Sequence, residues 1–266
     1  MSKKVAVIGV GNMAKAIIAG IRASDVAVST LYLYDVNPEQ YSSIFGDDIV
    51  YANSIEEAVS SCNYVLISVK PQNYPEVLSQ ISAVPFSSDR TYITIAAGIT
   101  VDTVSKALNT VNVVRVLPNL PMFIMKGVSA VCYNAKVREN DFDFIVEIFE
   151  AAGSVLKIEE RDINKIIGVT SSSPAYIFKF IKAIYDGAKL QGIDNDSLLE
   201  AICDVIIGSA ELIKSGFGAP EDLVKAVASK GGTTERALAV LDDNDFEKII
   251  ADAMIACTKR ADELGK

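Results

Sequence analysis

A glycine-rich turn near the start of the sequence is the first segment whose residue types suggest chemistry. Gly9, Gly11 and Ala14 follow the apolar run V-A-V-I at 5–8 and fit G-x-G-x-x-[GA], the strand–turn–helix pattern of dinucleotide sites. Gly9 allows a sharp turn, Gly11 lets the backbone approach a pyrophosphate, and Ala14 lets the helix pack closely on the strand. Because free N–H groups at the helix N-terminus favour anions, we predict a dinucleotide site here.

An acidic residue follows the turn at the distance expected of a ribose-binding carboxylate. Asp35 ends a predicted strand at 31–35 and lies 24 residues after Gly11, close to the distance at which an acid accepts from the adenosine ribose hydroxyls. A carboxylate there repels a 2′-phosphate, and no arginine follows it closely, so we predict a preference for NADH. The alternative is a solvated turn aspartate before Asn37 and Pro38.

Three further apolar strands end in small, polar or proline residues. The predicted strands cover 64–69, 91–95 and 111–117. A doubly wound parallel sheet binds its ligand beyond the carboxyl ends of its strands, so residues at these ends are candidates to line a nicotinamide site. They are Ser68, Lys70, Gly98 and Asn119. Each is explained equally well as an ordinary strand-end or turn residue.

The second half of the sequence carries one segment with a chemical pattern, S-K-G-G-T-T-E at 229–235. Free backbone N–H groups, threonine hydroxyls and a helix starting around Glu235 would together form a cradle for a carboxylate or a phosphate. The alternative is a plain helix–helix connection with a threonine N-cap.

The elements that position these segments divide the chain near residue 160. We predict an α/β Rossmann-like domain with a mostly parallel, doubly wound sheet at 1–160, followed by an all-α domain at 161–266. Further strands are expected at 128–133 and 155–158, and helices at 139–152, 163–190, 196–215, 220–228, 234–241 and 246–264. A capping box at Ser54 and Glu57 starts a short helix, and Pro174 is expected to kink the helix at 163–190.

Composition excludes several classes of function. The 266 residues carry a net charge of −9 and no histidine, which argues against nucleic-acid binding, His-based general base catalysis and most catalytic zinc sites; we predict no metal. The four cysteines form no C-x-x-C pair and are expected to be reduced thiols of a cytoplasmic protein. Neither a signal peptide nor a membrane span is expected.

Several motifs together resemble the pyrroline-5-carboxylate reductase family over essentially the whole length. They are G-V-G-N-M-A at 9–14, V-K-P-Q at 69–72, A-A-G at 96–98, R-V-L-P-N-L-P at 115–121, S-P-A-Y at 173–176, G-G-T-T at 231–234 and A-x-x-A-x-x-x-R-x-x-E-L at 253–264. The resemblance implies NAD(P)H-dependent reduction of 1-pyrroline-5-carboxylate to L-proline, the last step of proline biosynthesis. It also implies a helical domain that dimerises by interleaving helices, often within larger rings.

The resemblance also implies roles for individual residues. The pyrophosphate turn would consist of Gly9, Gly11, Asn12 and Met13, and the nicotinamide would be bordered by Lys70, Pro71, Ala97 and Gly98. Ser68 remains a cofactor-binding candidate from its place at a strand end. The substrate would be held by Ser229, Gly231, Gly232, Thr233 and Thr234, with Asn119 as a further candidate. Thr234, as the hydroxyl nearest the ring nitrogen, and Lys70 are the predicted catalytic residues. The chain departs from the family pattern at Leu117, Leu120, Ser171, Ser173 and Lys230, which affects the expected rigidity and shape of the pocket.

Two other functions stay open at this point. One is a reductase or dehydrogenase of the same fold acting on another cyclic imine or a β-hydroxyacid, with Lys70 or Lys230 as proton donor. The other is a non-catalytic nucleotide-binding relative, against which the intact G-G-T-T argues. Imine reduction suits a chain without histidine, because an iminium nitrogen already carries its proton and the reaction depends mainly on orientation.

Overall fold

An eight-stranded sheet forms the centre of the computed structural model, which describes residues 3–134 and 136–264. The strand order is β3-β2-β1-β4-β5-β6-β7-β8. All neighbouring pairs are parallel except β6 and β7, which are antiparallel. The strands are β1 (Lys3–Ile8), β2 (Val28–Tyr34), β3 (Ile49–Tyr51), β4 (Tyr64–Ile67), β5 (Thr91–Thr94), β6 (Val113–Leu117), β7 (Gly127–Tyr133) and β8 (Gly153–Lys157). The predicted mostly parallel sheet is confirmed.

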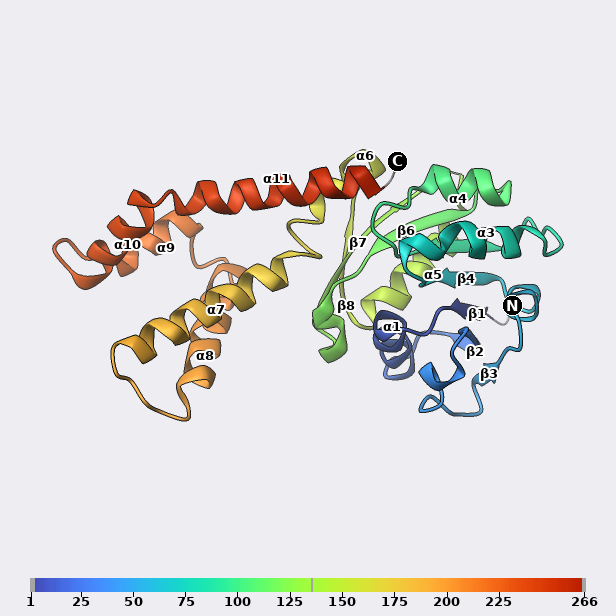
Figure 1. The fold of residues 1–266 in the computed structure, drawn as a ribbon, viewed down its shortest axis with the longest axis horizontal. Coiled ribbons are helices and arrows are strands. Elements are labelled where there is room, and N and C mark those ends of the chain that lie inside the picture. Colours follow the sequence, from blue (N-terminus) through green and yellow to red (C-terminus); the bar gives the residue numbers. More distant parts are fainter. Residues whose placement is uncertain (1–2, 135, 265–266) are drawn as a thin grey trace. The chain divides into compact units, whose positions relative to one another are not determined.

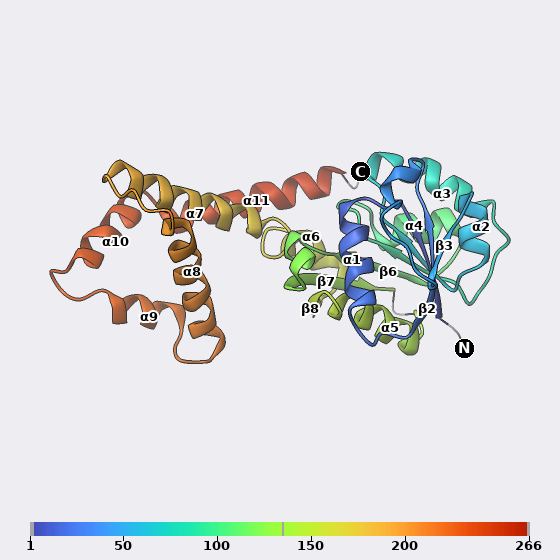
Figure 2. The same ribbon diagram turned by 90° about the horizontal axis from the view of Figure 1, so that it is seen from below.

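Helices cover both faces of this sheet (Figures 1 and 2). One face packs against α1 and α5, and the other against α2, α3, α4 and α6. These helices are α1 (Asn12–Arg22), α2 (Ile55–Ser60), α3 (Tyr74–Ser82), α4 (Val101–Leu108), α5 (Glu139–Glu150) and α6 (Glu160–Ile166), with 3₁₀ turns η1 (Pro38–Gln40), η2 (Pro71–Asn73) and η3 (Leu120–Ile124). This is the doubly wound arrangement expected from the sequence.

The apolar run at the start of the chain explains the position of β1 in the middle of the sheet. Val5 and Val7 face the core beneath α1 and α5, whereas Ala6 and Ile8 face the opposite core. Side chains of a strand alternate between faces, and a strand buried on both faces therefore needs apolar residues throughout. All four residues are at most 1% exposed.

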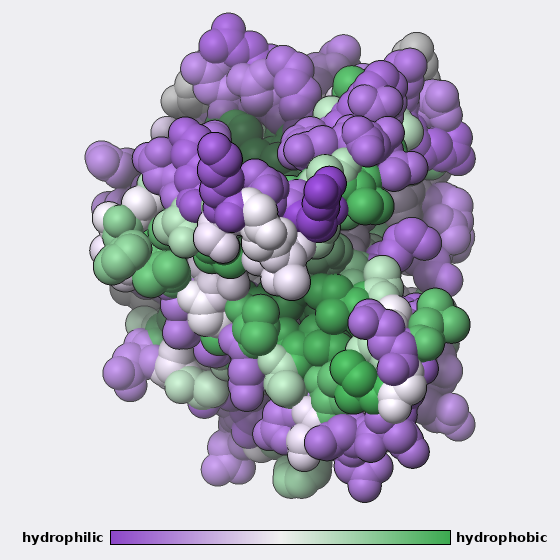
Figure 3. Space-filling model, turned by 90° about the vertical axis from the view of Figure 1, so that its left-hand side faces the viewer, coloured by the Kyte–Doolittle hydropathy of each residue, from purple (hydrophilic) through white to green (hydrophobic). Residues whose placement is uncertain are grey.

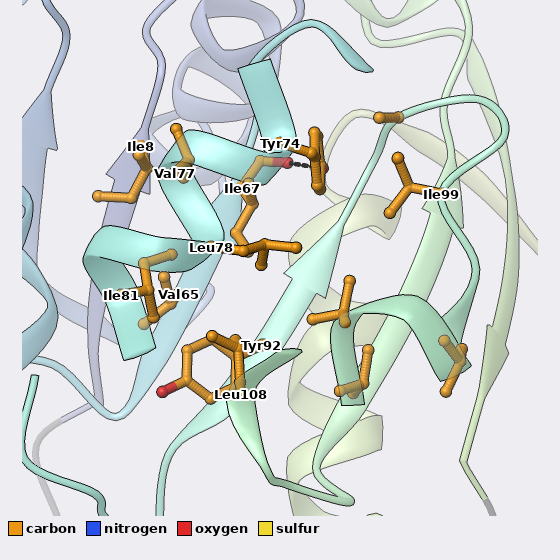
Figure 4. Close-up of a cluster of buried hydrophobic side chains, with 14 of the residues drawn as sticks. Ile8, Val65, Ile67, Tyr74, Val77, Leu78, Ile81, Tyr92, Ile99 and Leu108 are labelled. Carbon is orange, nitrogen blue, oxygen red and sulfur yellow. Dashed lines mark hydrogen bonds between the residues drawn. The ribbon is translucent and has the colours of Figure 1, made fainter. Parts of the chain in front are cut away.

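A buried tyrosine fixes helix α3 to the carboxyl end of β4 (Figure 4). The Tyr74 hydroxyl donates to the carbonyl oxygen of Ile67 at 2.8 Å and lies 2.7 Å from Thr94 Oγ1 on β5. Burial raises the pKa of Tyr74, so the hydroxyl stays protonated. These bonds hold the segment that follows β4, where Ser68 and Lys70 lie.

The chain separates into two compact units, Met1–Pro174 with Met254–Lys266, and Ala175–Ala253. The last part of α11 (Phe246–Leu264) belongs to the α/β unit, where Ala261 is buried in the core of the α2–α3–α4 face. At Gly98 an added Cβ would lie 2.7 Å from Leu264 Cβ, and at Gly168 it would lie 3.1 Å from Met254 Cβ. The carboxyl-terminal turns of α11 therefore complete the α/β unit.

The second unit contains only helices within its described residues. It comprises most of α7 (Ser173–Leu190), α8 (Leu198–Lys214), α9 (Pro220–Val227), α10 (Thr233–Asp243) and the first part of α11. Large apolar side chains are exposed on this unit. Figure 3 views the molecule from the side where α7 to α10 lie in Figure 1, and apolar residues gather on that face. Those of α7 and α8 are Ile177, Phe178, Phe180, Ile184, Leu190, Leu199, Val205, Ile207, Leu212 and Ile213.

The structure corrects the sequence-based expectations in two places. Pro174 does not kink a continuous helix: α6 ends at Ile166, and Pro174 lies in the first turn of α7, where a missing N–H costs no helical bond. The three-residue edge strand β3 was not expected. No helix in the described part of the chain is long and apolar enough to cross a membrane.

Candidate active site

The glycine turn has the geometry that its sequence predicts. Gly9 adopts φ +89°, and a Cβ added there would lie 2.8 Å from Val69 Cγ1 and 3.0 Å from the Ser68 carbonyl oxygen. Its N–H donates to the Tyr34 carbonyl oxygen at 2.8 Å, which joins the end of β1 to the end of β2. Only glycine satisfies both the backbone conformation and the space at this position.

The N-terminus of α1 has no side-chain cap and is accessible. Gly11 is the N-cap, it provides no side-chain cap, and the first turn contains no acidic residue. Nothing lies within 4 Å of the position of a Cβ on Gly11, so the backbone here is accessible to a ligand. The first N–H groups of a helix have no intrahelical partner, and together with the helix dipole they favour a phosphate.

Asp35 is held by backbone N–H groups on both of its oxygens. Val10 N donates to Oδ2 at 2.7 Å and Asn37 N donates to Oδ1 at 2.9 Å. The carboxylate is half-buried beside the glycine turn. Since each carboxylate oxygen can accept two hydrogen bonds, the side chain keeps the capacity to accept from ribose hydroxyls.

A cavity of about 660 Å³ opens at the carboxyl ends of β1, β2 and β4. It brings together six of the ten predicted cofactor-binding residues, which are Gly9, Gly11, Asn12, Asp35, Ser68 and Lys70. Side chains of Ile55 and Val77 supply apolar lining from α2 and α3. A concave site with a glycine turn, a helix N-terminus, an acid and an apolar wall fits an adenine dinucleotide.

The other four predicted cofactor-binding residues lie outside the lining of this cavity. Pro71 and Gly98 line a second cavity of about 590 Å³ together with Tyr74 and Leu264. Met13 packs partly buried against the core beneath α1, and Ala97 precedes Gly98 in the loop after β5. Their contact with a nicotinamide stays a prediction.

Asn119 is buried, and its side-chain amide joins two other segments. Its Nδ2 donates to the Thr170 carbonyl oxygen at 2.9 Å, and its Oδ1 accepts from Val128 N at 2.8 Å. The side chain thus connects the end of β6, the start of β7 and the turn before α7. Both ends of the amide therefore have a protein partner. Substrate binding by Asn119 stays a prediction.

A buried arginine links the same strand to the helices behind it. The Arg115 guanidinium is 1% exposed and donates from Nη2 to Asn164 Oδ1 at 2.7 Å. Asn164 Nδ2 in turn donates to Asp262 Oδ1 on α11 at 2.8 Å. Burial lowers the pKa of Arg115. Asn164 thus connects the buried guanidinium to the carboxylate of Asp262 through two hydrogen bonds.

The three serines at the start of α7 and in the turn before it differ in their surroundings. Ser172 Oγ lies 3.1 Å from Cys257 Sγ on α11, and Ser173 Oγ donates to the Val169 carbonyl oxygen at 2.5 Å. Ser171 Oγ is buried and has no protein partner. Ser171 and Ser173, at which the chain departs from the family pattern, therefore have different environments.

The G-G-T-T loop lies in the helical unit and leads directly into α10. Thr233 is the first residue of α10 and Gly232 is its N-cap, without a side-chain cap. The alternative of a threonine N-cap is therefore wrong, because the threonines occupy the first turn. The Thr233 and Thr234 hydroxyls form no hydrogen bond with the described residues, which leaves them available to a ligand.

Comparisons with known proteins match both halves of the chain. The family model described as "Pyrroline-5-carboxylate reductase dimerisation" matches residues 160–264, and the model "NADP oxidoreductase coenzyme F420-dependent" matches residues 4–98. The pyrroline-5-carboxylate reductase of Escherichia coli K12 is 33% identical over 271 residues, covering 100% of both chains. That of Vibrio alginolyticus is 34% identical and covers 99% of this chain and 98% of its own.

The chain belongs to the pyrroline-5-carboxylate reductase family. The resemblance predicted from the motifs is confirmed, and the chain is an oxidoreductase of this family. The crystal structure of the Plasmodium falciparum pyrroline carboxylate reductase with NADP bound has a TM-score of 0.89 and 25% identity, covering 99% of this chain and 98% of that one. The reductase from Streptococcus pyogenes matches with a TM-score of 0.88 and 26% identity over 98% and 99% of the two chains.

Membership of the pyrroline-5-carboxylate reductase family agrees with the chemistry of the described side chains. Within residues 3–134 and 136–264 no group of three or more Cys, Asp or Glu residues is placed to hold a metal ion. The cavity beside the glycine turn fits a nicotinamide dinucleotide, and substrate binding by the hydroxyls of the G-G-T-T loop stays a prediction. One residue of that loop was given no role in the sequence analysis: Glu235, whose carboxylate accepts from Gly231 N.

Proposed function

We propose that this chain catalyses the NAD(P)H-dependent reduction of 1-pyrroline-5-carboxylate to L-proline. The observation that carries the proposal is the full-length identity of 33% to a pyrroline-5-carboxylate reductase. It is supported by a cavity suited to a dinucleotide in one unit and a loop with free hydroxyls in the other. When bound, the cofactor supplies a hydride for the imine carbon.

The α/β unit binds and orients the cofactor in this proposal. The N–H groups at the start of α1 hold the pyrophosphate, and Gly9 and Gly11 give it access to the backbone. Ser68 and Lys70 line the same cavity and, with Pro71, Ala97 and Gly98, border the nicotinamide. Lys70 is exposed at the end of β4, where its charge attracts an anionic substrate.

The helical unit holds the substrate carboxylate. The first N–H groups of α10 and the hydroxyls of Thr233 and Thr234 are the donors, because no described residue uses those hydroxyls. Thr234 supplies the hydroxyl nearest the ring nitrogen. Ser229, Gly231 and Gly232 shape the backbone of the cradle.

We also propose that NADH is preferred over NADPH. The Asp35 carboxylate is fixed beside the glycine turn by Val10 N and Asn37 N, so it cannot swing away to make room for a 2′-phosphate. Two anionic groups close together repel each other. The ribose hydroxyls of NADH can instead donate to the free lone pairs of the same carboxylate.

Self-association through the helical unit is part of the proposal. The region at 160–264 matches a dimerisation model, and α7 and α8 expose many large apolar side chains. Exposed apolar surface of this extent marks an interaction site, so we propose a dimer or a larger assembly built from dimers. The cytoplasmic location inferred from the cysteines stays a prediction.

The decisive experiment is an assay of NADH and NADPH oxidation with 1-pyrroline-5-carboxylate. Activity with this substrate, and a lower KM for NADH than for NADPH, are expected. No oxidation of either cofactor at millimolar substrate would refute the proposal. Equal activity in reverse with a 2- or 3-hydroxyacid would instead favour a dehydrogenase of the same fold.

A further inference from the structure

The G-G-T-T loop begins with a tight turn. Its third residue has a backbone conformation that favours glycine. Gly232 N donates to the Ser229 carbonyl oxygen at 2.9 Å, which closes a four-residue turn from Ser229 to Gly232. Gly231, the third residue of this turn, has φ +73°. A turn of type II needs a positive φ at that position, and it favours proline at the second, which is Lys230 here.

A carboxylate from the first turn of α10 reaches back to this turn. Gly231 N donates to Glu235 Oε2 at 2.7 Å. In an ordinary capping box the third helical residue accepts from the N-cap N–H. Here the N–H of the N-cap Gly232 already donates to the Ser229 carbonyl oxygen. Glu235 therefore accepts from Gly231, the residue before the N-cap.

We infer that Glu235 is a positioning residue for the substrate loop, an inference that rests on the function proposed above. Glu235 and Ser229 take up the N–H groups of Gly231 and Gly232. The next donors along the chain are the N–H groups and hydroxyls of Thr233 and Thr234, which are the groups proposed to bind the substrate carboxylate. The Glu235 bond therefore fixes the path of the backbone that leads into the cradle.

The residue at the second turn position makes this bond necessary. Lys230 is exposed and forms no hydrogen bond or ion pair with the described residues. A lysine leaves φ free, whereas a proline at the same position fixes it near the value that the turn requires. With lysine at this place, the order of the turn depends on the bond from Gly231 to Glu235.

The test compares three variants of the full-length protein. Glu235→Ala removes the acceptor, Glu235→Gln keeps an acceptor oxygen without the charge, and Glu247→Ala removes an exposed acid from the first turn of α11 as a matched control. Two quantities are measured: hydrogen–deuterium exchange of a peptide covering 228–236, and the KM for each substrate. Thermal unfolding checks that every variant is folded.

The inference predicts a specific pattern among these variants. Glu235→Ala should speed exchange in the peptide and raise the KM for 1-pyrroline-5-carboxylate by about five- to tenfold, the net value of one ordinary hydrogen bond, with the KM for NADH unchanged. Glu235→Gln and Glu247→Ala should stay within about twofold of the wild type, because both keep the loop N–H bonded. In the Glu235→Ala background, Lys230→Pro should restore most of the affinity.

Two results would overturn the inference, and one would overturn only the proposed function. If Glu235→Ala matches Glu247→Ala in exchange and in KM, Glu235 does not position the loop. If Lys230→Pro fails to restore the substrate KM while it slows exchange in the peptide, turn geometry does not control substrate affinity. If the wild type does not reduce 1-pyrroline-5-carboxylate, the proposed function fails, and the exchange data alone decide whether Glu235 orders the turn.

Discussion

Two glycine-rich turns, each leading into a helix N-terminus, are built in contrasting ways. At 9–14 the turn is held by the sheet, because Gly9 is pressed against Val69 and Ser68 and donates to Tyr34. At 229–234 nothing lies within 4 Å of a Cβ on Gly231, and the bonds that shape the loop are accepted by Ser229 and by the adjoining Glu235. The first turn is fixed by tertiary packing and the second by local hydrogen bonds, so the two should respond differently to the same kind of substitution.

Gly9→Ala should have the largest effect. The new Cβ combines a positive φ with contacts at 2.8 Å and 3.0 Å, so we expect a loss of at least about 2 kcal/mol in the free energy of unfolding. NADH binding should be lost as well, because the N-terminus of α1 would shift. Denaturant unfolding and NADH titration measure these effects; a variant with unchanged NADH affinity would contradict them.

Thr234→Ala should remove a substrate contact without weakening the fold. We expect kcat/KM for 1-pyrroline-5-carboxylate to fall by roughly 10- to 100-fold, the range for a hydrogen bond to a charged group, with unchanged NADH affinity and melting temperature. Thr234→Ser retains the hydroxyl and is the matched control, expected to keep most of the activity. Parallel loss of substrate and NADH affinity would indicate misfolding instead.

Asp35→Asn should change cofactor preference by about tenfold in kcat/KM, toward NADPH. The substitution keeps the size of the side chain and one acceptor for Val10 N or Asn37 N, while it removes the charge that repels a 2′-phosphate. Steady-state kinetics with both cofactors provide the test. An unchanged NADH-to-NADPH ratio would show that Asp35 does not contact the ribose.

Gly231→Ala should be milder than Gly9→Ala, which is the direct test of the contrast. Only the positive φ of +73° opposes the alanine, since its Cβ meets no atom within 4 Å. We expect a cost of about 1 kcal/mol in unfolding free energy and a modest rise in substrate KM. Equal destabilisation by the two alanines would mean that the 229–234 loop is packed as tightly as the 9–14 turn.

The smallest expected effect is a difference in reactivity between buried and less buried cysteine thiols. Burial raises the pKa of Cys62 and of Cys132 to about 12, so neither is ionised at mildly alkaline pH, and only the thiolate is a good nucleophile. In the native protein we expect at most two of the four cysteines to react with a thiol reagent, and all four after unfolding. Reaction of Cys62 in the native state would show that the α/β core opens readily.

Sequence patterns predicted the strands that are buried on both faces. They missed a short edge strand and a helix boundary, which depend on contacts between segments far apart in the sequence. The apolar runs of β1 and β4 needed no tertiary information, because a strand buried on both faces has few polar residues. By contrast, β3 has three residues at the sheet edge and pairs only with β2, too short for a periodic signal. The change of helix at Pro174 was missed because a proline in the first turn and a proline inside a helix look alike in sequence.

The site was predictable where a motif dictates backbone shape and less so where a side chain acts on distant segments. The positive φ of Gly9 follows from the glycine pattern. The bonds of Asn119 to Val128 and Thr170 do not, because no local pattern shows which loops meet in the fold. The position of Glu235 was within reach of the sequence, because the third residue of a helix is where an acidic side chain reaches back to a preceding N–H, but which N–H it accepts from was not.

The return of α11 to the α/β unit has a consequence for how the protein is made. Residues 254–264 are synthesised after the helices of the second unit, yet Ala261 fills part of the core formed by the earlier α/β segment and Leu264 lies against Gly98. Domains generally fold in the order of synthesis. The packing of the α/β unit is complete only after residues 175–253 and then the last turns of α11 have been synthesised. Until α11 has been synthesised, the nascent α/β unit exposes apolar surface, and its risk of aggregation is highest during this interval.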